Sequence, residues 1–107
     1  MSRVAVVVVP IKPGMYEAAR ALVDTGPPFR LEDTPLEGHC VYLTEHEAVF
    51  VFEGPEARAA VEALVGDAEV WQAATAWRDC LAGKPRVADI AFSWRKGGPD
   101  PLHVPGL

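Results

Sequence analysis

Two unbroken apolar runs constrain the fold of this chain more than any other feature of its sequence. Val4–Val9 and Ala48–Phe52 contain no polar residue, and both consist mostly of the β-branched and aromatic residues that favour strands. A strand with one wet face alternates apolar and polar side chains, so an unbroken run indicates a strand covered on both faces. The pattern therefore predicts a sheet with helices on one side and a second cover on the other.

The rest of the sequence predicts the order strand, helix, strand, strand, helix, strand. Residues 3–10, 39–44, 48–53 and 87–94 have the composition of strands. Residues 15–26 and 54–83 have helical periodicity, which Gly66 and Asp67 interrupt. Asp67 can cap the helical segment that follows it. One face of that segment is apolar at spacings of four, three and four, namely Val70, Ala74, Trp77 and Leu81.

This order is the ferredoxin-like β-α-β-β-α-β motif, an α+β fold with an antiparallel sheet. Its first and third strands should form the central pair. We expect residues 1–96 to form a single domain of this kind. Residues 97–107 contain three prolines and no periodicity, so we expect an irregular tail with no regular element, which could reach across to a partner.

Composition excludes several classes of partner. The chain has 107 residues and a formal net charge of −5, and its lysines and arginines are scattered singly, which argues against binding to nucleic acid or to an anionic membrane surface. No apolar run approaches the ~18 residues of a membrane span. The opening residues lack the cleavage site of a signal peptide, and two isolated cysteines do not make a disulfide framework. These features predict a cytoplasmic protein.

The segments "LVDTGPPF" and "HCVYLTEHEAVFVFEG", together with the element order and the doubly apolar central strands, resemble the dimeric α+β barrel superfamily. This superfamily includes the antibiotic-biosynthesis-monooxygenase-like proteins and the stress-responsive barrel proteins, and the resemblance covers residues 3–96. It implies a homodimer in which two sheets face each other as a barrel. It also implies a small ligand cavity between the sheet and the helices of each chain.

A second copy of the same sheet is also the simplest cover for the helix-free face, because an exposed patch of Val and Phe invites aggregation. Such an interface should bury at least ~1,200 Å² in total. The chain departs from the enzymes of the superfamily in having no asparagine and no histidine on an expected helix. No catalytic residue is therefore transferred from the resemblance, and we expect no cofactor.

Four residues are candidates for a site. His39 opens the second strand, where it could accept a proton or a hydrogen bond, or could simply be a solvated strand-end residue. Tyr42, Trp71 and Trp94 are candidate ligand contacts, with Trp94 as the aromatic wall of the cavity. The long loop of residues 27–38 would form part of a lid, with His39 at its edge. His39 and His46 lack a third ligand, so no metal site is predicted.

Three functions follow from these observations. The first is a small homodimeric α+β barrel protein of unassigned biochemical activity, with a small apolar or aromatic molecule as its candidate ligand. The second is a cofactor-independent monooxygenase or isomerase acting on a small aromatic or polyketide-like substrate. The third is a structural or partner-binding module. Fold alone does not choose among them, but a cavity lined by Trp, Tyr and His would favour the second, and a filled core the third.

Overall fold

Four strands of the described chain form one antiparallel sheet. The structure, a computed structural model, describes residues 3–27, 30–98 and 102–103. The order across the sheet is β2 (Gly38–Leu43), β3 (Glu47–Glu53), β1 (Val4–Pro10) and β4 (Arg86–Ala88). The first and third strands of the chain are therefore central, as predicted, and they pair along their whole length.

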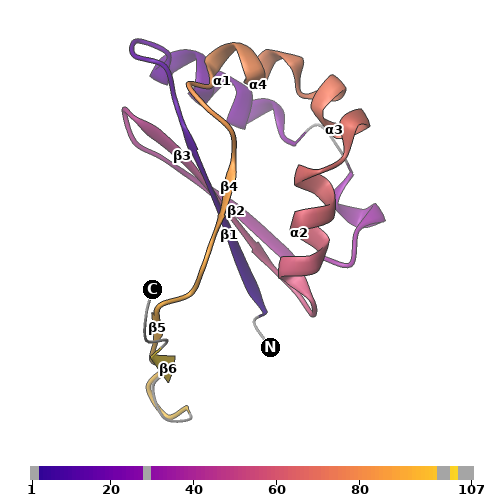
Figure 1. Ribbon diagram of the computed structural model, residues 1–107, viewed down its shortest axis with the longest axis vertical. Coiled ribbons are helices and arrows are strands. Elements are labelled where there is room, and N and C mark those ends of the chain that lie inside the picture. Colours follow the sequence, from indigo (N-terminus) through magenta and orange to yellow (C-terminus); the bar gives the residue numbers. More distant parts are fainter. Residues whose placement is uncertain (1–2, 28–29, 99–101, 104–107) are drawn as a thin grey trace.

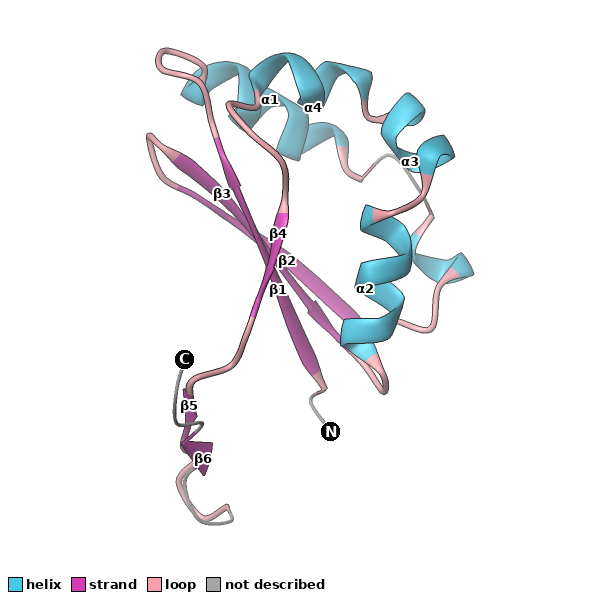
Figure 2. Ribbon diagram, in the orientation of Figure 1, coloured by secondary structure: helices cyan, strands magenta, loops and turns pink. Residues whose placement is uncertain are grey.

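The helices lie on one side of this sheet (Figures 1 and 2). They are α1 (Tyr16–Thr25), α2 (Ala57–Val65), α3 (Ala68–Ala73) and α4 (Thr75–Cys80), and a short 3₁₀ turn, Leu31–Asp33, follows α1. The prediction of a small α+β domain is confirmed. The predicted cap of α3 is present as well, because the Asp67 carboxylate accepts a hydrogen bond from the Glu69 N–H at 2.8 Å.

The last helical region is divided, where the sequence predicted one continuous helix. Ala74 separates α3 from α4 with φ −93° and ψ 27°. The hydroxyl of Thr75 donates to the main-chain oxygen of Gln72 at 2.6 Å. Such local side-chain bonds from Thr compete with regular helix geometry. The break turns α4 back towards α1, which it contacts.

The main core lies between β1, β3 and α2. Side chains of β1 alternate, and those that point to the helices are almost fully buried, with Ala5, Val7 and Val9 each 3–4% exposed. They pack with Phe52 of β3 and with buried side chains of α2. Burial of a side chain such as Val7 stabilises the fold by about 1.5–3 kcal/mol.

We call the other side of the sheet the open face. Strand alternation and the pairing register place there the side chains of Val4, Val6, Val8, Cys40, Tyr42, Val49 and Val51. No helix of the described chain lies over this side in Figure 1. Val4 is 42% exposed and Tyr42 62% exposed, so the face is apolar and only partly covered by its own neighbours.

The last strand and the tail differ from the prediction. Residues 87–94 do not form one strand, because β4 ends at Ala88 and a separate strand, β5 (Phe92–Ser93), follows. β5 pairs with β6 (Leu102–His103), although we expected no regular element after residue 96. β4 can pair with β1 only at Val6–Val8, and beyond that point the chain turns away from the sheet (Figure 1).

Candidate functional site

A cavity lies between the sheet and the helices α3 and α4. Within the described residues the backbones of these two helices come close to other helices and not to a strand, and α4 reaches the sheet through the Trp77 side chain, which meets Phe50 of β3. The space that remains has a volume of about 120 Å³, on the order of an apolar cavity that holds one benzene-sized ring. Its walls are apolar. They include Val7, Val9, Phe50 and Phe52 of the sheet and all four residues of the predicted helical face, Val70, Ala74, Trp77 and Leu81.

A second cavity, of about 280 Å³, lies beside the first. Phe50, Phe52 and Trp77 line both cavities and form the partition between them. The rings of Phe50 and Trp77 meet edge to face, with centroids 5.4 Å apart and an interplanar angle of 71°, an arrangement that aromatic pairs favour. The partition therefore consists of aromatic side chains from β3 and α4.

His39 lines the second cavity. It lies opposite Phe52 in the pairing of β2 with β3, and the imidazole stacks on the Phe52 ring with centroids 4.4 Å apart. The ring nitrogen Nδ1 lies 3.0 Å from the main-chain oxygen of Val51. A carbonyl oxygen only accepts, so Nδ1 carries the proton and donates. In the neutral imidazole the other nitrogen, Nε2, then has the free lone pair.

This geometry defines what the site can do chemically. A neutral imidazole with Nε2 as acceptor can bind an O–H or N–H group, or take its proton. The surrounding rings of Phe50, Phe52 and Trp77 offer flat apolar contact. Cys40 also borders the cavity, but strand alternation points its side chain to the open face. Among the described lining residues, His39 thus supplies the polar side chain.

The three other candidate residues are not brought together with His39. Tyr42 lies on the open face, where a hydrogen bond with the Cys40 side chain is the main cause that raises the pKa of its hydroxyl. Trp94 is 62% exposed and is not among the described residues that line either cavity. The side chain of Trp71 lies outside the described part of the structure.

Trp77 takes the place that we expected for Trp94. Its helical spacing with Val70 and Ala74 marked it as inward-facing, and the sequence supported core packing as its role. The sequence did not indicate that the backbones of α3 and α4 lie away from the sheet and leave space under Trp77. Gly26 and Pro27 border the second cavity, so the expected lid loop contributes Pro27. Pro28 and Phe29 lie outside the described residues.

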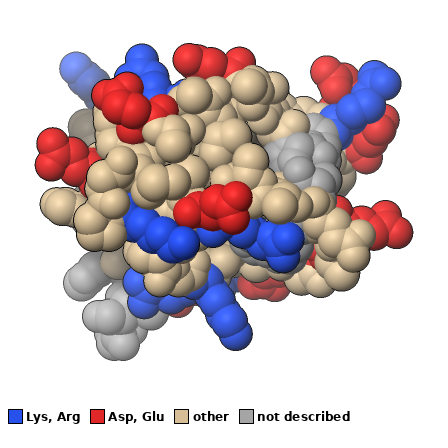
Figure 3. All heavy atoms as spheres, turned by 90° about the horizontal axis from the view of Figure 1, so that it is seen from above, with Lys and Arg blue, Asp and Glu red and all other residues tan. Residues whose placement is uncertain are grey.

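The described side chains offer no group of three or more that could hold a metal ion. Figure 3 shows acidic and basic side chains interspersed with neutral ones over the end of the molecule that carries α1 and α4. In the part of the chain that the structure describes, no helix is both long enough and apolar enough to cross a membrane.

Two comparisons with known proteins found no relative of this chain. No protein-family model matches the chain, and a search of curated proteins returns no match.

Proposed function

We propose that the protein binds a small, flat, mostly apolar molecule that carries one hydrogen-bond donor. The ligand would lie against Phe50, Phe52 and Trp77, and its O–H or N–H would donate to Nε2 of His39. The observation that supports this is the bond from His39 Nδ1 to the Val51 oxygen, because it leaves the acceptor nitrogen for a ligand in a cavity whose other described walls are mainly apolar.

The proposal includes the architecture that the sequence resembles. We propose a ferredoxin-like domain that pairs its open face with that of a second copy, as in dimeric α+β barrels. The strand order β2-β3-β1-β4 is compatible with such a domain. The half-buried valines of the open face, Val6, Val8, Val49 and Val51, supply the apolar surface that a stable interface needs at its centre.

The test uses two probes of the same shape, 2-naphthol and naphthalene, in equilibrium dialysis. One neutral hydrogen bond contributes about 0.5–1.5 kcal/mol, so we expect the wild-type protein to bind 2-naphthol about 2–10 times more tightly than naphthalene. In His39→Phe the acceptor is lost while the aromatic surface remains, so both probes should bind with equal affinity.

His46→Phe is the matched control, because His46 is exposed in the turn between β2 and β3 and borders neither cavity described above. This variant should keep the preference for 2-naphthol. The proposal fails if the wild-type protein binds neither probe at millimolar concentration. It also fails if the preference survives in His39→Phe.

A second candidate function uses the same imidazole as a proton acceptor, in a cofactor-independent oxygenase or isomerase. The specific observation in its favour is the 3.0 Å bond from His39 Nδ1 to the Val51 oxygen, which makes Nε2 the acceptor nitrogen of the neutral imidazole. General acid–base contributions are worth roughly 10²–10⁴ in rate. Turnover of an aerated phenolic or enolic probe, followed by mass spectrometry and lost in His39→Phe, would favour this function over binding alone.

A further inference from the structure

The chain leaves the sheet abruptly after β4. In the register that pairs Val6 with Ala88, a continued strand would place Ile90 opposite Val4. Instead the pairing stops, and β5 and β6 form a separate hairpin beyond the sheet (Figures 1 and 2). Within the described residues this hairpin contacts no other helix or strand of the chain. We call residues 89–98, with Leu102 and His103, the arm.

The arm exposes large apolar side chains. Ile90 is 42% exposed, and Phe92 and Trp94 are each 62% exposed. They are separated by Ala91 and Ser93, so in an extended chain the three large side chains share one side. An isolated two-stranded hairpin is only marginally stable in water. A hairpin with two residues in each strand should be less stable still. The arm therefore needs a surface to lie on.

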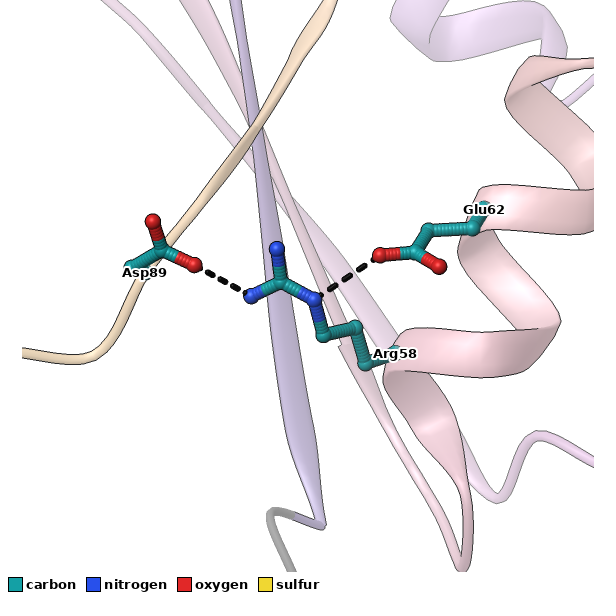
Figure 4. A network of polar contacts seen from close by, with 3 residues as sticks. All are labelled: Arg58, Glu62 and Asp89. Atoms are coloured by element: carbon teal, nitrogen blue, oxygen red, sulfur yellow. Dashed lines mark hydrogen bonds and ion pairs between the residues drawn. The ribbon is translucent and has the colours of Figure 1, made fainter.

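The root of the arm is fixed to the body. Arg58 of α2 donates to the Asp89 carboxylate at 2.6 Å and to the Glu62 carboxylate at 2.8 Å (Figure 4). Asp89 is the first residue after β4, so this network holds the place from which the arm departs. From this point the arm runs beyond the edge of its own sheet (Figure 1).

We propose that the arm docks on the open face of a second copy of this chain, and that the two copies exchange arms about a two-fold axis. The proposal rests on the homodimer of the proposed function and adds the residues that clasp it. In a contact with two-fold symmetry, both copies use the same surfaces. Each chain carries the two surfaces that this contact needs, the arm and the open face.

Area and charge support a second copy as the occupant. Each aromatic side chain can bury about 150–250 Å². Two exchanged arms would therefore add several hundred Å² to the sheet contact, towards the ~1,200–2,000 Å² of a stable interface. Beyond Trp94 the arm continues with exposed Arg95 and Lys96, and the pairing of β3 with β1 places Glu47 and Glu53 at the two ends of the open face. Basic arm ends can thus meet acidic ends of the partner face.

The first experiment measures the dimer dissociation constant by analytical ultracentrifugation. For the double variant Ile90→Ser with Trp94→Ser we expect the constant to rise about a hundredfold or more, because each dimer loses four apolar contacts. The matched control, Ala91→Ser with Ser93→Ala, changes the opposite side of the same arm and should leave the constant unchanged. Far-UV circular dichroism checks that both variants remain folded.

The outcomes separate the two proposals. A wild-type chain that is monomeric at micromolar concentration overturns both the dimer and the exchange of arms. A wild-type dimer whose constant is unchanged in the double variant overturns only the exchange and leaves the sheet-to-sheet dimer. Neither measurement depends on a ligand, so failure of the naphthol test leaves these results unaffected.

A cross-linking experiment tests the contact with the large apolar side chains of the arm intact. Arg95→Cys places a thiol beside Trp94, and Cys40 is an exposed thiol on the open face, whereas Cys80 is buried. A short bismaleimide should join the new thiol to Cys40 of the second copy and give a band of twice the mass in denaturing gels. The band should disappear when Cys40→Ser is added. A band of single mass in the first variant would overturn the proposal.

Discussion

Cys40 and Cys80 are the same residue type in two environments. Cys80 ends α4 and is 2% exposed. Burial, followed by the charge of Asp79, raises the pKa of its thiol above the ordinary value of 9.0. The sequence indicated a small buried apolar role for both cysteines, and that holds for Cys80 alone, because Cys40 is exposed.

This difference predicts a pH dependence of stability. The folded pKa of Cys80 is raised, so the unfolded chain loses the thiol proton at lower pH than the folded chain does. The contribution to stability is therefore fully present below the unfolded pKa near 9.0 and is lost as the pH rises through the higher folded value. Urea unfolding of Cys80→Ala between pH 7 and pH 10 should show a shallower decline in stability than wild type. Equal slopes in wild type and Cys80→Ala would contradict the prediction.

The candidate site could be predicted only in part from single residues. His39 was found because a polar ring at the start of an apolar strand stands out in the sequence. The sequence ranked Trp94 above Trp77 as the aromatic wall, although both follow an apolar periodicity and either could have faced a cavity. Which of the two tryptophans faces the cavity depends on the positions of α4 and the arm relative to the sheet. The local spacing of apolar residues does not contain that information.

At the scale of elements, the connection from β3 to α2 depends on Gly54. Its φ is +152°, which disfavours any residue with a Cβ, and a Cβ there would lie 3.1 Å from the Pro35 oxygen and 3.2 Å from the Glu37 nitrogen. These neighbours belong to the chain that enters β2, and Glu37 N–H donates to the Glu53 oxygen at 2.7 Å. Gly54 therefore allows the connection from β3 to α2 to pack against the Pro35–Glu37 segment that enters β2.

We predict that Gly54→Ala lowers the free energy of unfolding by about 2 kcal/mol or more, from backbone strain and contact with the Pro35–Glu37 backbone. Gly66→Ala is the control, because Gly66 has φ −87° and an added Cβ would make only ordinary contact, no closer than 3.4 Å. It should be neutral or stabilise by about 0.4–1 kcal/mol, chiefly through the unfolded chain. Urea titration of both variants measures the difference, and equal losses would show that Gly54 has no special role.

Element type was readable where hydrophobic periodicity was strong, and element continuity was not. β1 and β3 follow from unbroken runs of β-branched and aromatic residues. The break after Ala88 could not be read, because residues 87–94 alternate as a strand should and the segment does form two short strands. β1 extends to Val4, yet its pairing with β4 stops at Val6 and Ala88, so the end of β4 is not set by the length of its neighbour.

At the scale of the whole molecule, one layer of helices covers one side of the sheet, and the open face and the arm both expose apolar side chains. A chain of 107 residues has a limited core of its own. In the dimer that we propose, the missing second cover and the support for the arm come from the same neighbour. Folding and association would then be linked, since each copy stabilises the surface that the other exposes.

This linkage predicts that the melting temperature depends on protein concentration. A dimer that unfolds to two separate chains gains stability by mass action, and each tenfold rise in concentration adds about 1.4 kcal/mol per dimer. For a dimer of this size the melting temperature should rise by about 3–6 °C per tenfold increase. Differential scanning calorimetry from micromolar to hundreds of micromolar measures it. In Ile90→Ser with Trp94→Ser the unfolding transition should lose this dependence over the range where the variant is monomeric. A wild-type melting temperature that is constant across the range would mean that each chain unfolds alone, and that the open face is stable without a second copy.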